Sequence, residues 1–285
     1  MSRLRVAIVG CGPNGRRGYM AHLQTFDDVE LVAICDPVAT ARDGAGDEFG
    51  VSRRYADVDD LLDNETLDAA FVITPAHLNA PVALRCLERG VNTEVTKPPG
   101  LRVAETKALR AAATRTGAKA MVSWSYRFHP LVNQALAMVK ERGPVVQVVG
   151  EFHKSMSGFA GRGALATSPG RTTFPEILLD NMLMESPIHS IDLLRVFAGA
   201  EVAEVHSVVR RACSPYKDVH GALILFENGC LGHLIANYTT DSRLQRYEIH
   251  GRDISAYLEG ISQGTVFCDG KQHELRELGT GGRRE

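Results

Sequence analysis

A glycine-rich hexapeptide near the N-terminus has the spacing of a phosphate-binding turn. The segment matches the pattern G-x-G-x-x-G and comprises Gly10, Cys11, Gly12, Pro13, Asn14 and Gly15. In such a turn the first glycine permits a sharp bend, the second lets a pyrophosphate approach the backbone, and the third lets a helix pack closely. The free N–H groups at the start of that helix bind phosphate oxygens. We therefore predict that residues 10–15 hold the pyrophosphate of a dinucleotide.

An acidic residue stands where such a site needs one. Asp36 ends the apolar run VELVAICD, about 20 residues beyond the last glycine of the turn. A carboxylate at this place binds the ribose hydroxyls of the adenosine half and repels a 2′-phosphate. The sequence therefore favours NAD as the cofactor. Arg42 is a nearby cation that could soften this preference, so NADP remains an alternative.

A lysine followed by two prolines occurs in EVTKPPG, residues 94–100. In an open parallel sheet, ligands bind at the carboxyl ends of the strands, so we expect Lys97 beside the nicotinamide half of the cofactor. Pro98 and Pro99 restrict the backbone around it, and a cis Lys97–Pro98 bond is one of the two conformations allowed. A desolvated lysine near a positively charged nicotinamide has a lowered pKa and could exchange a proton with a substrate oxygen. An ordinary solvated lysine is the alternative, and spacing alone favours neither.

A histidine occupies the predicted start of a helix in MESPIHSIDLL, residues 184–194. Ser186 is the expected N-cap and Pro187 the first helical residue. His189 then lies in the first turn, where the helix dipole disfavours the imidazolium form. A neutral imidazole can accept or donate a proton, which makes His189 a candidate acid–base group. A histidine that only packs or caps is the alternative.

The elements that must position these residues follow two patterns. Apolar β-branched runs over 4–10, 29–36, 67–75, 91–99 and 119–126 alternate with helical segments, which predicts a doubly wound parallel sheet of the Rossmann type. After about residue 128, helices over 130–143 and 186–199 accompany a string of short strands. This second pattern predicts an α+β domain with an open, mainly antiparallel sheet. The expected domains are residues 1–122 and residues 123–285. The Gly/Ser-rich segment 155–176 is expected to be a surface loop.

Composition limits the classes of partner. The 285 residues carry a formal net charge of -2 with no marked Lys/Arg cluster, so we expect neither nucleic acid nor an anionic membrane as a partner. The six cysteines form no C-x-x-C pair and no His cluster has zinc spacing, so no metal site is expected. Reduced cysteines and the absence of a signal peptide or a long apolar run predict a cytoplasmic protein.

Four segments together resemble the glucose-fructose oxidoreductase / inositol dehydrogenase (Gfo/Idh/MocA) family in order and spacing. They are VAIVGCGPNG, CDPVATAR, VITPAHLNAPVALRCLERGVNTEVTKPPG and YRFHP. The resemblance implies a Rossmann domain followed by an α+β domain with an open antiparallel sheet. It also implies hydride transfer between NAD(P) and a sugar or cyclitol. The loop TPAHLN matches the cofactor-side loop of the family, which places Thr74, Pro75 and His77 along the nicotinamide half.

The resemblance also implies a catalytic group. The family signature Glu-Lys-Pro puts its lysine on Lys97, whereas Thr96 stands at the position of its glutamate. The family stretch Asp-x-Gly-x-His-x-x-Asp matches at His189 and Asp192, with Glu185 in place of the first aspartate. Lys97, Glu185 and His189 are therefore the expected catalytic residues.

Further residues are candidates for substrate contact. Besides His189, they are Tyr126 and Arg127, which end the last strand of the predicted Rossmann domain, and His153, which ends the first strand of the next domain. An interdomain structural role is the alternative for Tyr126 and Arg127, and a position on a solvated sheet face is the favoured alternative for His153. The apolar alternation over 219–238 predicts a sheet face that a second copy of the chain covers, and hence a homo-oligomer.

The sequence as a whole predicts an NAD(P)-dependent oxidoreductase acting on CH–OH groups of a sugar-like or polyol-like substrate. Three alternatives are an NAD-dependent glycosidase of the same fold, a reductase of a non-sugar double bond, and a non-catalytic dinucleotide-binding sensor or subunit. Thr96 and Glu185 are the departures that keep the last alternative open. Family members usually continue with a final helical segment, so we expect a more open pocket or one that a partner subunit completes.

Overall fold

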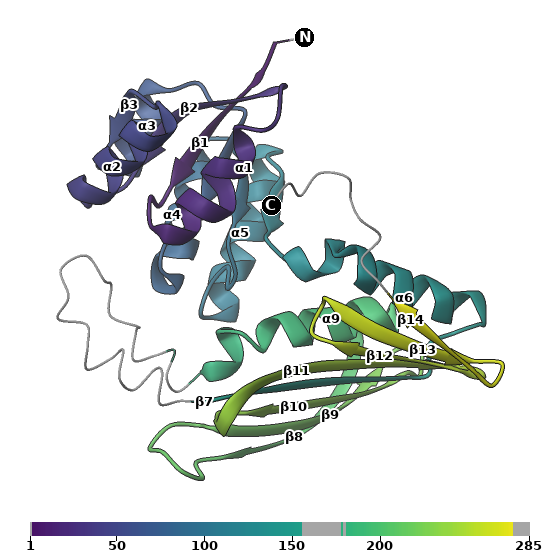
Figure 1. The fold of residues 1–285 in the computed structure, drawn as a ribbon. Helices are drawn as coiled ribbons and strands as arrows, with labels where there is room; N and C mark the ends of the chain where they lie inside the picture. Colours follow the sequence, from purple (N-terminus) through teal and green to yellow (C-terminus); the bar gives the residue numbers. More distant parts are fainter. Residues whose placement is uncertain (1, 156–177, 179–180, 276–285) are drawn as a thin grey trace. The chain divides into compact units, whose positions relative to one another are not determined.

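The computed structural model describes residues 2–155, 178 and 181–275, which form two compact units (Figure 1). The first unit ends at Ser123 and the second begins at Trp124. Apart from Ser155, the Gly/Ser-rich segment 155–176 lies outside the described residues.

The first unit is built on a six-stranded parallel sheet. Its strand order is β3-β2-β1-β4-β5-β6. The strands are β1 (Leu4–Val9), β2 (Val29–Cys35), β3 (Arg53–Tyr55), β4 (Ala69–Val72), β5 (Asn92–Val95) and β6 (Ala120–Val122). The helices are η1 (Gly15–Met20), α1 (Ala21–Leu23), α2 (Ala39–Phe49), α3 (Val58–Asn64), α4 (Ala76–Glu88) and α5 (Val103–Thr116). The order is that of a doubly wound sheet, as predicted.

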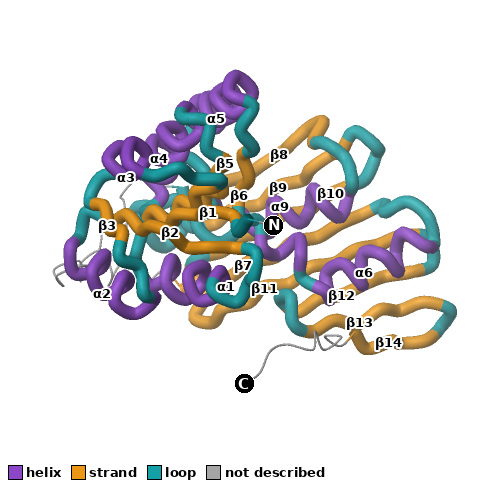
Figure 2. The backbone as a smooth tube through the Cα atoms, turned by 90° about the horizontal axis from the view of Figure 1, so that it is seen from above, coloured by secondary structure: helices purple, strands orange, loops and turns teal. Residues whose placement is uncertain are grey.

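Helices cover both faces of this sheet (Figure 2). Val6 and Ile8 of β1 pack with Met20 and α2, whereas Ala7 and Val9 pack with α3, α4 and α5. A strand buried on both sides needs apolar residues at every position, which is why the runs in β1 and β2 are continuous rather than alternating. The carboxyl end of β1 carries the glycine turn, and the carboxyl end of β5 carries the Lys97 loop.

The second unit is built on an eight-stranded sheet of order β14-β13-β12-β11-β7-β10-β9-β8. The strands are β7 (Gln147–Ser155), β8 (Val202–Arg210), β9 (Val219–Phe226), β10 (Leu231–Asn237), β11 (Thr239–Gly251), β12 (Ile254–Glu259), β13 (Gln263–Cys268) and β14 (Lys271–Leu275). Every neighbouring pair is antiparallel except β7 and β10, which are parallel. The predicted mainly antiparallel sheet is therefore confirmed.

Two helices cover one face of this larger sheet (Figure 1). They are α6 (Pro130–Glu141) and α9 (Ile188–Ala198), and the short turns η2 (Ser125–Phe128) and η3 (Met182–Met184) precede them. Leu131 of α6, Phe197 of α9 and Tyr247 of β11 are fully buried in the core between helices and sheet. The opposite face of the sheet has no helix from the described residues against it, and it keeps several large apolar side chains exposed. In the described part of the chain, no helix is both long and apolar enough to cross a membrane.

Candidate active site

The glycine turn has the backbone that its spacing predicts. Gly10 adopts a φ of 110°, and a Cβ at this position would fall on the carbonyl group of Ile73. A Cβ at Gly15 would fall on the carbonyl oxygen of Gly10. In contrast, a Cβ at Gly12 would meet nothing within 4 Å. The turn is thus closed by packing at its two ends and open at Gly12, where a phosphate group would approach. This geometry fits a dinucleotide.

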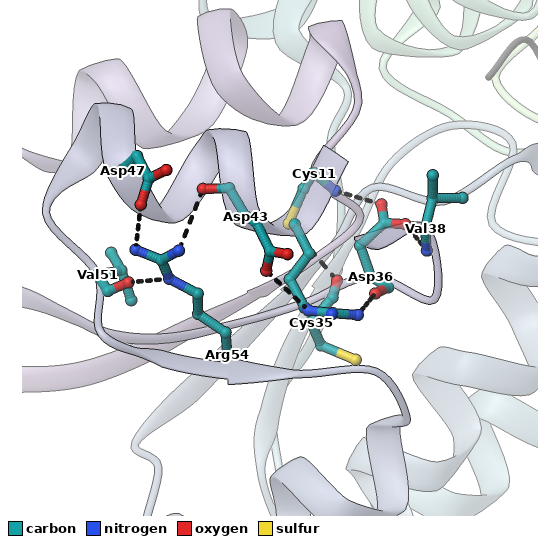
Figure 3. Close-up of polar contacts among 9 residues, drawn as sticks. Cys11, Cys35, Asp36, Val38, Asp43, Asp47, Val51 and Arg54 are labelled. Carbon is teal, nitrogen blue, oxygen red and sulfur yellow. Dashed lines mark hydrogen bonds and ion pairs between the residues drawn. The ribbon is translucent and has the colours of Figure 1, made fainter. Parts of the chain in front are cut away.

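Asp36 is connected directly to this turn (Figure 3). Its carboxylate accepts hydrogen bonds from the backbone N–H of Cys11 and of Val38, both at 2.8 Å. Arg42 donates to the carbonyl oxygen of Asp36 at 3.0 Å and lies 3.4 Å from the Asp43 carboxylate. Because each carboxylate oxygen can accept a further hydrogen bond, Asp36 still has acceptor capacity for ribose hydroxyls.

A buried asparagine connects the loop after β4 with the loop that carries Lys97. Thr74 donates its hydroxyl to Asn79 Oδ1 at 2.8 Å. Asn79 Nδ2 donates to the carbonyl oxygens of Thr96 at 3.2 Å and Pro98 at 2.8 Å. Lys97 lies between these two residues and is half-buried, and its peptide bond to Pro98 is cis. The predicted cofactor loop and the predicted catalytic lysine are therefore held together by one side chain.

Pro75 and His77 lie at the start of α4. Pro75 is the N-cap residue, and the exposed His77 occupies the first turn. The helix begins at Ala76, and Pro81 lies inside it.

A row of hydrogen-bonded polar side chains lies along one face of β5 and β6. Ser123 bonds to the carboxylate of Glu94, and its hydroxyl lies 2.6 Å from that of Tyr19. Tyr19 also hydrogen bonds with the side chain of Thr96, and burial raises the pKa of Tyr19. Glu94 precedes Thr96 by two residues and so shares its side of the extended chain. A carboxylate is thus linked through Ser123 and Tyr19 to position 96, which itself has none.

In the second unit, His189 is held between aromatic rings. It lies in the first turn of α9 and is 9% exposed. The ring of Tyr126 stacks on it at 4.3 Å between centroids, and Trp124 meets it edge-on at 6.2 Å. The next residue, Ser190, lies within hydrogen-bonding distance of Tyr247 at 3.2 Å. Tyr126 and His189, two predicted substrate contacts, are therefore neighbours.

Glu185 has two polar partners that the sequence did not indicate. Ser186 donates its hydroxyl to the Glu185 carboxylate, and Lys154 Nζ lies 3.9 Å from the same oxygen. The prediction of Ser186 as the N-cap is wrong, because α9 begins at Ile188 with Pro187 as its N-cap. The Ser186 hydroxyl bonds to Glu185, a charged acceptor, which forms stronger hydrogen bonds than neutral groups do.

Arg127 and His153 have different surroundings. Arg127 forms a two-pronged ion pair with the buried Asp192, with Nε to Oδ2 at 2.7 Å. This hydrogen bonding to Asp192 raises the pKa of Arg127. His153 alternates along β7 with Phe152, which packs with Met182 on the helix-covered side of the sheet. His153 therefore lies on the opposite face from α9 and His189.

Metal-binding residues are not grouped in the part of the chain that the structure describes. No set of three or more His, Cys, Asp or Glu side chains there could hold a metal ion. Sequence reasoning missed Asn79, Glu94, Ser123, Tyr19 and Lys154. Each is a single polar residue, and only Asn79 and Glu94 lie in motifs that had been singled out.

Comparison with known proteins identifies relatives over most of the chain. A model described as "Oxidoreductase family, NAD-binding Rossmann fold" matches residues 4–124, and one described as "GFO/IDH/MocA C-terminal domain" matches residues 134–257. The scyllo-inositol 2-dehydrogenase (NAD(+)) of Bacillus subtilis is 24% identical over 95% of this chain and 75% of the relative. The D-apiose dehydrogenase of Paraburkholderia graminis is 25% identical over 84% of this chain and 62% of the relative.

A solved structure has the same fold. An oxidoreductase from Agrobacterium radiobacter in complex with NAD+, L-tartaric acid and magnesium matches with a TM-score of 0.81 at 20% identity. The match covers 99% of this chain and 83% of that one. The two family models, together with the glycine turn, Asp36 and the sheet topology, show that this chain belongs to the GFO/IDH/MocA family of oxidoreductases, whose N-terminal domain is an NAD-binding Rossmann fold.

Proposed function

We propose that this protein is a dehydrogenase that transfers a hydride between a nicotinamide dinucleotide and a CH–OH carbon of a sugar, cyclitol or related polyol. The observation that carries the proposal is the direct hydrogen bond between the glycine turn and Asp36. This hydrogen bond joins the backbone that would bind phosphate and the carboxylate that would bind ribose into one site. Relatives named as inositol and apiose dehydrogenases support the substrate class.

The cofactor, when bound, accepts or donates the hydride at its nicotinamide ring. Residues of this chain then handle the hydroxyl proton and the orientation of the substrate. We assign proton exchange to Lys97 and His189, and we assign Glu185 to orienting or relaying, supported by its contact with Lys154. Tyr126 and Arg127 orient substrate or His189, supported by the stacking of Tyr126 and the fixed ion pair of Arg127. His153 is the weakest of these candidates, because it lies on the face of the sheet opposite α9 and His189.

NAD is the proposed cofactor rather than NADP. Asp36 places a negative charge beside the turn, and Arg42 is already engaged by the Asp36 carbonyl and by Asp43. Cytoplasmic location is supported by the six free thiols, because disulfides are rare in reducing compartments. Burial raises the pKa of Cys11, Cys35 and Cys86 to about 12 in each case, which suits inert core residues.

Fluorescence titration with NADH and NADPH tests the cofactor site. Asp36→Ala should weaken NADH binding at least roughly tenfold, because hydrogen bonds to charged groups contribute about 1.5–3 kcal/mol. Asp47→Ala is the matched control, since Asp47 belongs to the same unit but pairs with Arg54 on the surface. NADPH binding tighter than NADH, or an unchanged affinity in Asp36→Ala, would contradict the NAD assignment.

A turnover screen with sugars, cyclitols and nucleotide sugars then tests the reaction. Lys97→Ala should lower kcat on any accepted substrate by about 10²–10⁴-fold, the usual contribution of general acid–base catalysis. Release of a cleaved sugar would favour the glycosidase alternative. NADH binding without turnover across the screen would favour a sensor or subunit, and full activity of Lys97→Ala would favour reduction of a non-sugar double bond.

A further inference from the structure

We propose that Asn79 is a positioning residue that fixes the orientation of Lys97 relative to the cofactor loop. The inference deepens the proposed function and rests on it, since it concerns the proton-exchanging lysine of the same site. Asn79 is fully buried, with 0% of its surface exposed. An amide is rarely buried unless its polar atoms have partners, and all three interactions of this one go to the two loops at the site.

The hydrogen bonds bracket the lysine. The Asn79 Nδ2 group donates to the carbonyl oxygens of Thr96 and Pro98, the residues immediately before and after Lys97. Carbonyl oxygens can only accept, so the nitrogen end of the amide must face them and the oxygen end must face the Thr74 hydroxyl. The peptide unit that joins Thr96 to Lys97 and the one that joins Pro98 to Pro99 are thus both bonded to a single rigid group.

The Asn79 Nδ2 donor matters to the Lys97 loop because two residues of this loop are prolines. Pro98 and Pro99 carry no N–H group, so neither can donate the backbone hydrogen bond that closes most turns. The oxygen end of Asn79 connects to Thr74, directly after Ile73, whose carbonyl group Gly10 approaches so closely that a Cβ would not fit. The glycine turn is therefore connected to the Lys97 loop by the close packing of Gly10 against Ile73 and by the Asn79 side-chain amide.

A matched control separates positioning from simple stability. Asn92 begins the same strand, β5, at its opposite end. Its Nδ2 donates to the carbonyl oxygen of Asp68 at 2.8 Å, and its Oδ1 accepts from the backbone N–H of Lys119 at 2.9 Å. Asn92→Ala therefore also removes side chain–backbone hydrogen bonds from the same unit, but at the sheet edge remote from the Lys97 loop.

The experiment compares Asn79→Ala, Asn79→Ser and Asn92→Ala with the wild-type chain. Melting temperature and NADH affinity are measured for each, and then kcat as a function of pH on a substrate from the screen. The Asn79 variants should bind NADH within about threefold of wild type, yet lose roughly 10²-fold in kcat, because small displacements of a catalytic group cost about that much. Asn92→Ala should keep kcat within about twofold, since no catalytic group moves. Asn79→Ser serves if Asn79→Ala does not fold.

A second readout does not require turnover. The rate at which Lys97 is acylated by an amine-reactive reagent is followed by mass spectrometry across pH, without cofactor. A changed pH dependence of Lys97 acylation in the Asn79 variants, with Asn92→Ala matching wild type, supports positioning even if no substrate is found and the proposed function fails. If the acylation profile of the Asn79 variants also matches wild type, or if their kcat equals that of Asn92→Ala, Asn79 is a structural residue and the inference is overturned.

Discussion

At the scale of single residues, His189 is a side chain whose surroundings restrict its motion. The stacked ring of Tyr126 and the edge of Trp124 fix the imidazole plane at the start of α9. If His189 exchanges the substrate proton, His189→Asn should lower kcat by about 10²–10⁴-fold while NADH affinity stays unchanged. Steady-state kinetics and fluorescence titration check this, with His22→Asn as the control because His22 is an exposed residue of α1. Equal losses of kcat in both variants would remove His189 from the proton path.

The residues that sequence reasoning found and missed differ in their physical signal. Lys97 and His189 are singled out because they match family motifs, whereas spacing alone leaves a solvated lysine and a packing histidine as alternatives. Asn79 gives no such signal, since its role depends on carbonyl groups of residues 96 and 98, which only the folded chain brings near. The loop TPAHLN drew attention to His77, yet the structure leaves His77 exposed and buries Asn79 instead.

At the scale of elements, the parallel sheet of the first unit and the mainly antiparallel sheet of the second were predictable, whereas the short strand β3 and the parallel pairing of β7 with β10 were not. Continuous apolar runs and helical periodicity indicated the parallel sheet because burial on both faces leaves that pattern. No strand was predicted over Arg53–Tyr55, since β3 is a short edge strand with polar residues. The parallel pairing of β7 with β10 joins segments about 80 residues apart, and a contact at that separation leaves no local pattern in either strand.

The turn between β8 and β9 depends on a buried carboxylate. Burial alone would raise the pKa of Asp218, but hydrogen bonds from the backbone N–H groups of Ala212, Cys213 and Ser214 outweigh it, so this pKa lies below its usual value. Because the unfolded chain then binds the proton more readily, Asp218 stabilises the fold fully above its unfolded pKa of about 3.9. That contribution is lost as the pH falls through the lower, folded-state pKa.

Thermal unfolding of Asp218→Asn tests the contribution of this carboxylate. The variant should melt below wild type at neutral pH, by the equivalent of about 1–3 kcal/mol, because the amide is a weaker acceptor than the carboxylate. The difference in melting temperature should shrink as the pH is lowered below about 4, because the unfolded chain then takes up a proton on Asp218 more readily than the folded chain does. Asp27→Asn, in an exposed loop, should melt like wild type throughout. A difference that stays constant with pH would exclude the charge of Asp218 as the cause.

At the scale of the whole molecule, one face of the larger sheet, called the open face, has no described helix against it and exposes large apolar side chains. The apolar side chains exposed on this open face are Val208, Leu223, Leu225, Ile235, Tyr257 and Phe267. They come from five strands in two groups, β8–β10 and β12–β13, which lie on either side of β7 and β11. Large apolar patches on soluble proteins mark interaction sites, and two copies of one sheet face are self-complementary about a twofold axis. We therefore expect the homo-oligomer proposed from the sequence to form through this face.

A charge placed on the open face tests that expectation. Leu223 lies on β9. In a symmetric interface, Leu223→Glu would bury one unpaired carboxylate from each of the two copies, which is strongly destabilising. Light scattering coupled to size exclusion should then show an oligomer for wild type and a monomer for Leu223→Glu. The matched control is Val103→Glu, an exposed valine at the start of α5 in the other unit, which should leave the mass unchanged. A monomeric wild type, or an oligomer that tolerates the charge at Leu223, would show that the open face is not the interface. Asp36 and the glycine turn belong to the first unit, whereas Leu223 belongs to the second, so Leu223→Glu does not alter the dinucleotide site directly. A change of NADH affinity in this variant would therefore show that self-association affects that site.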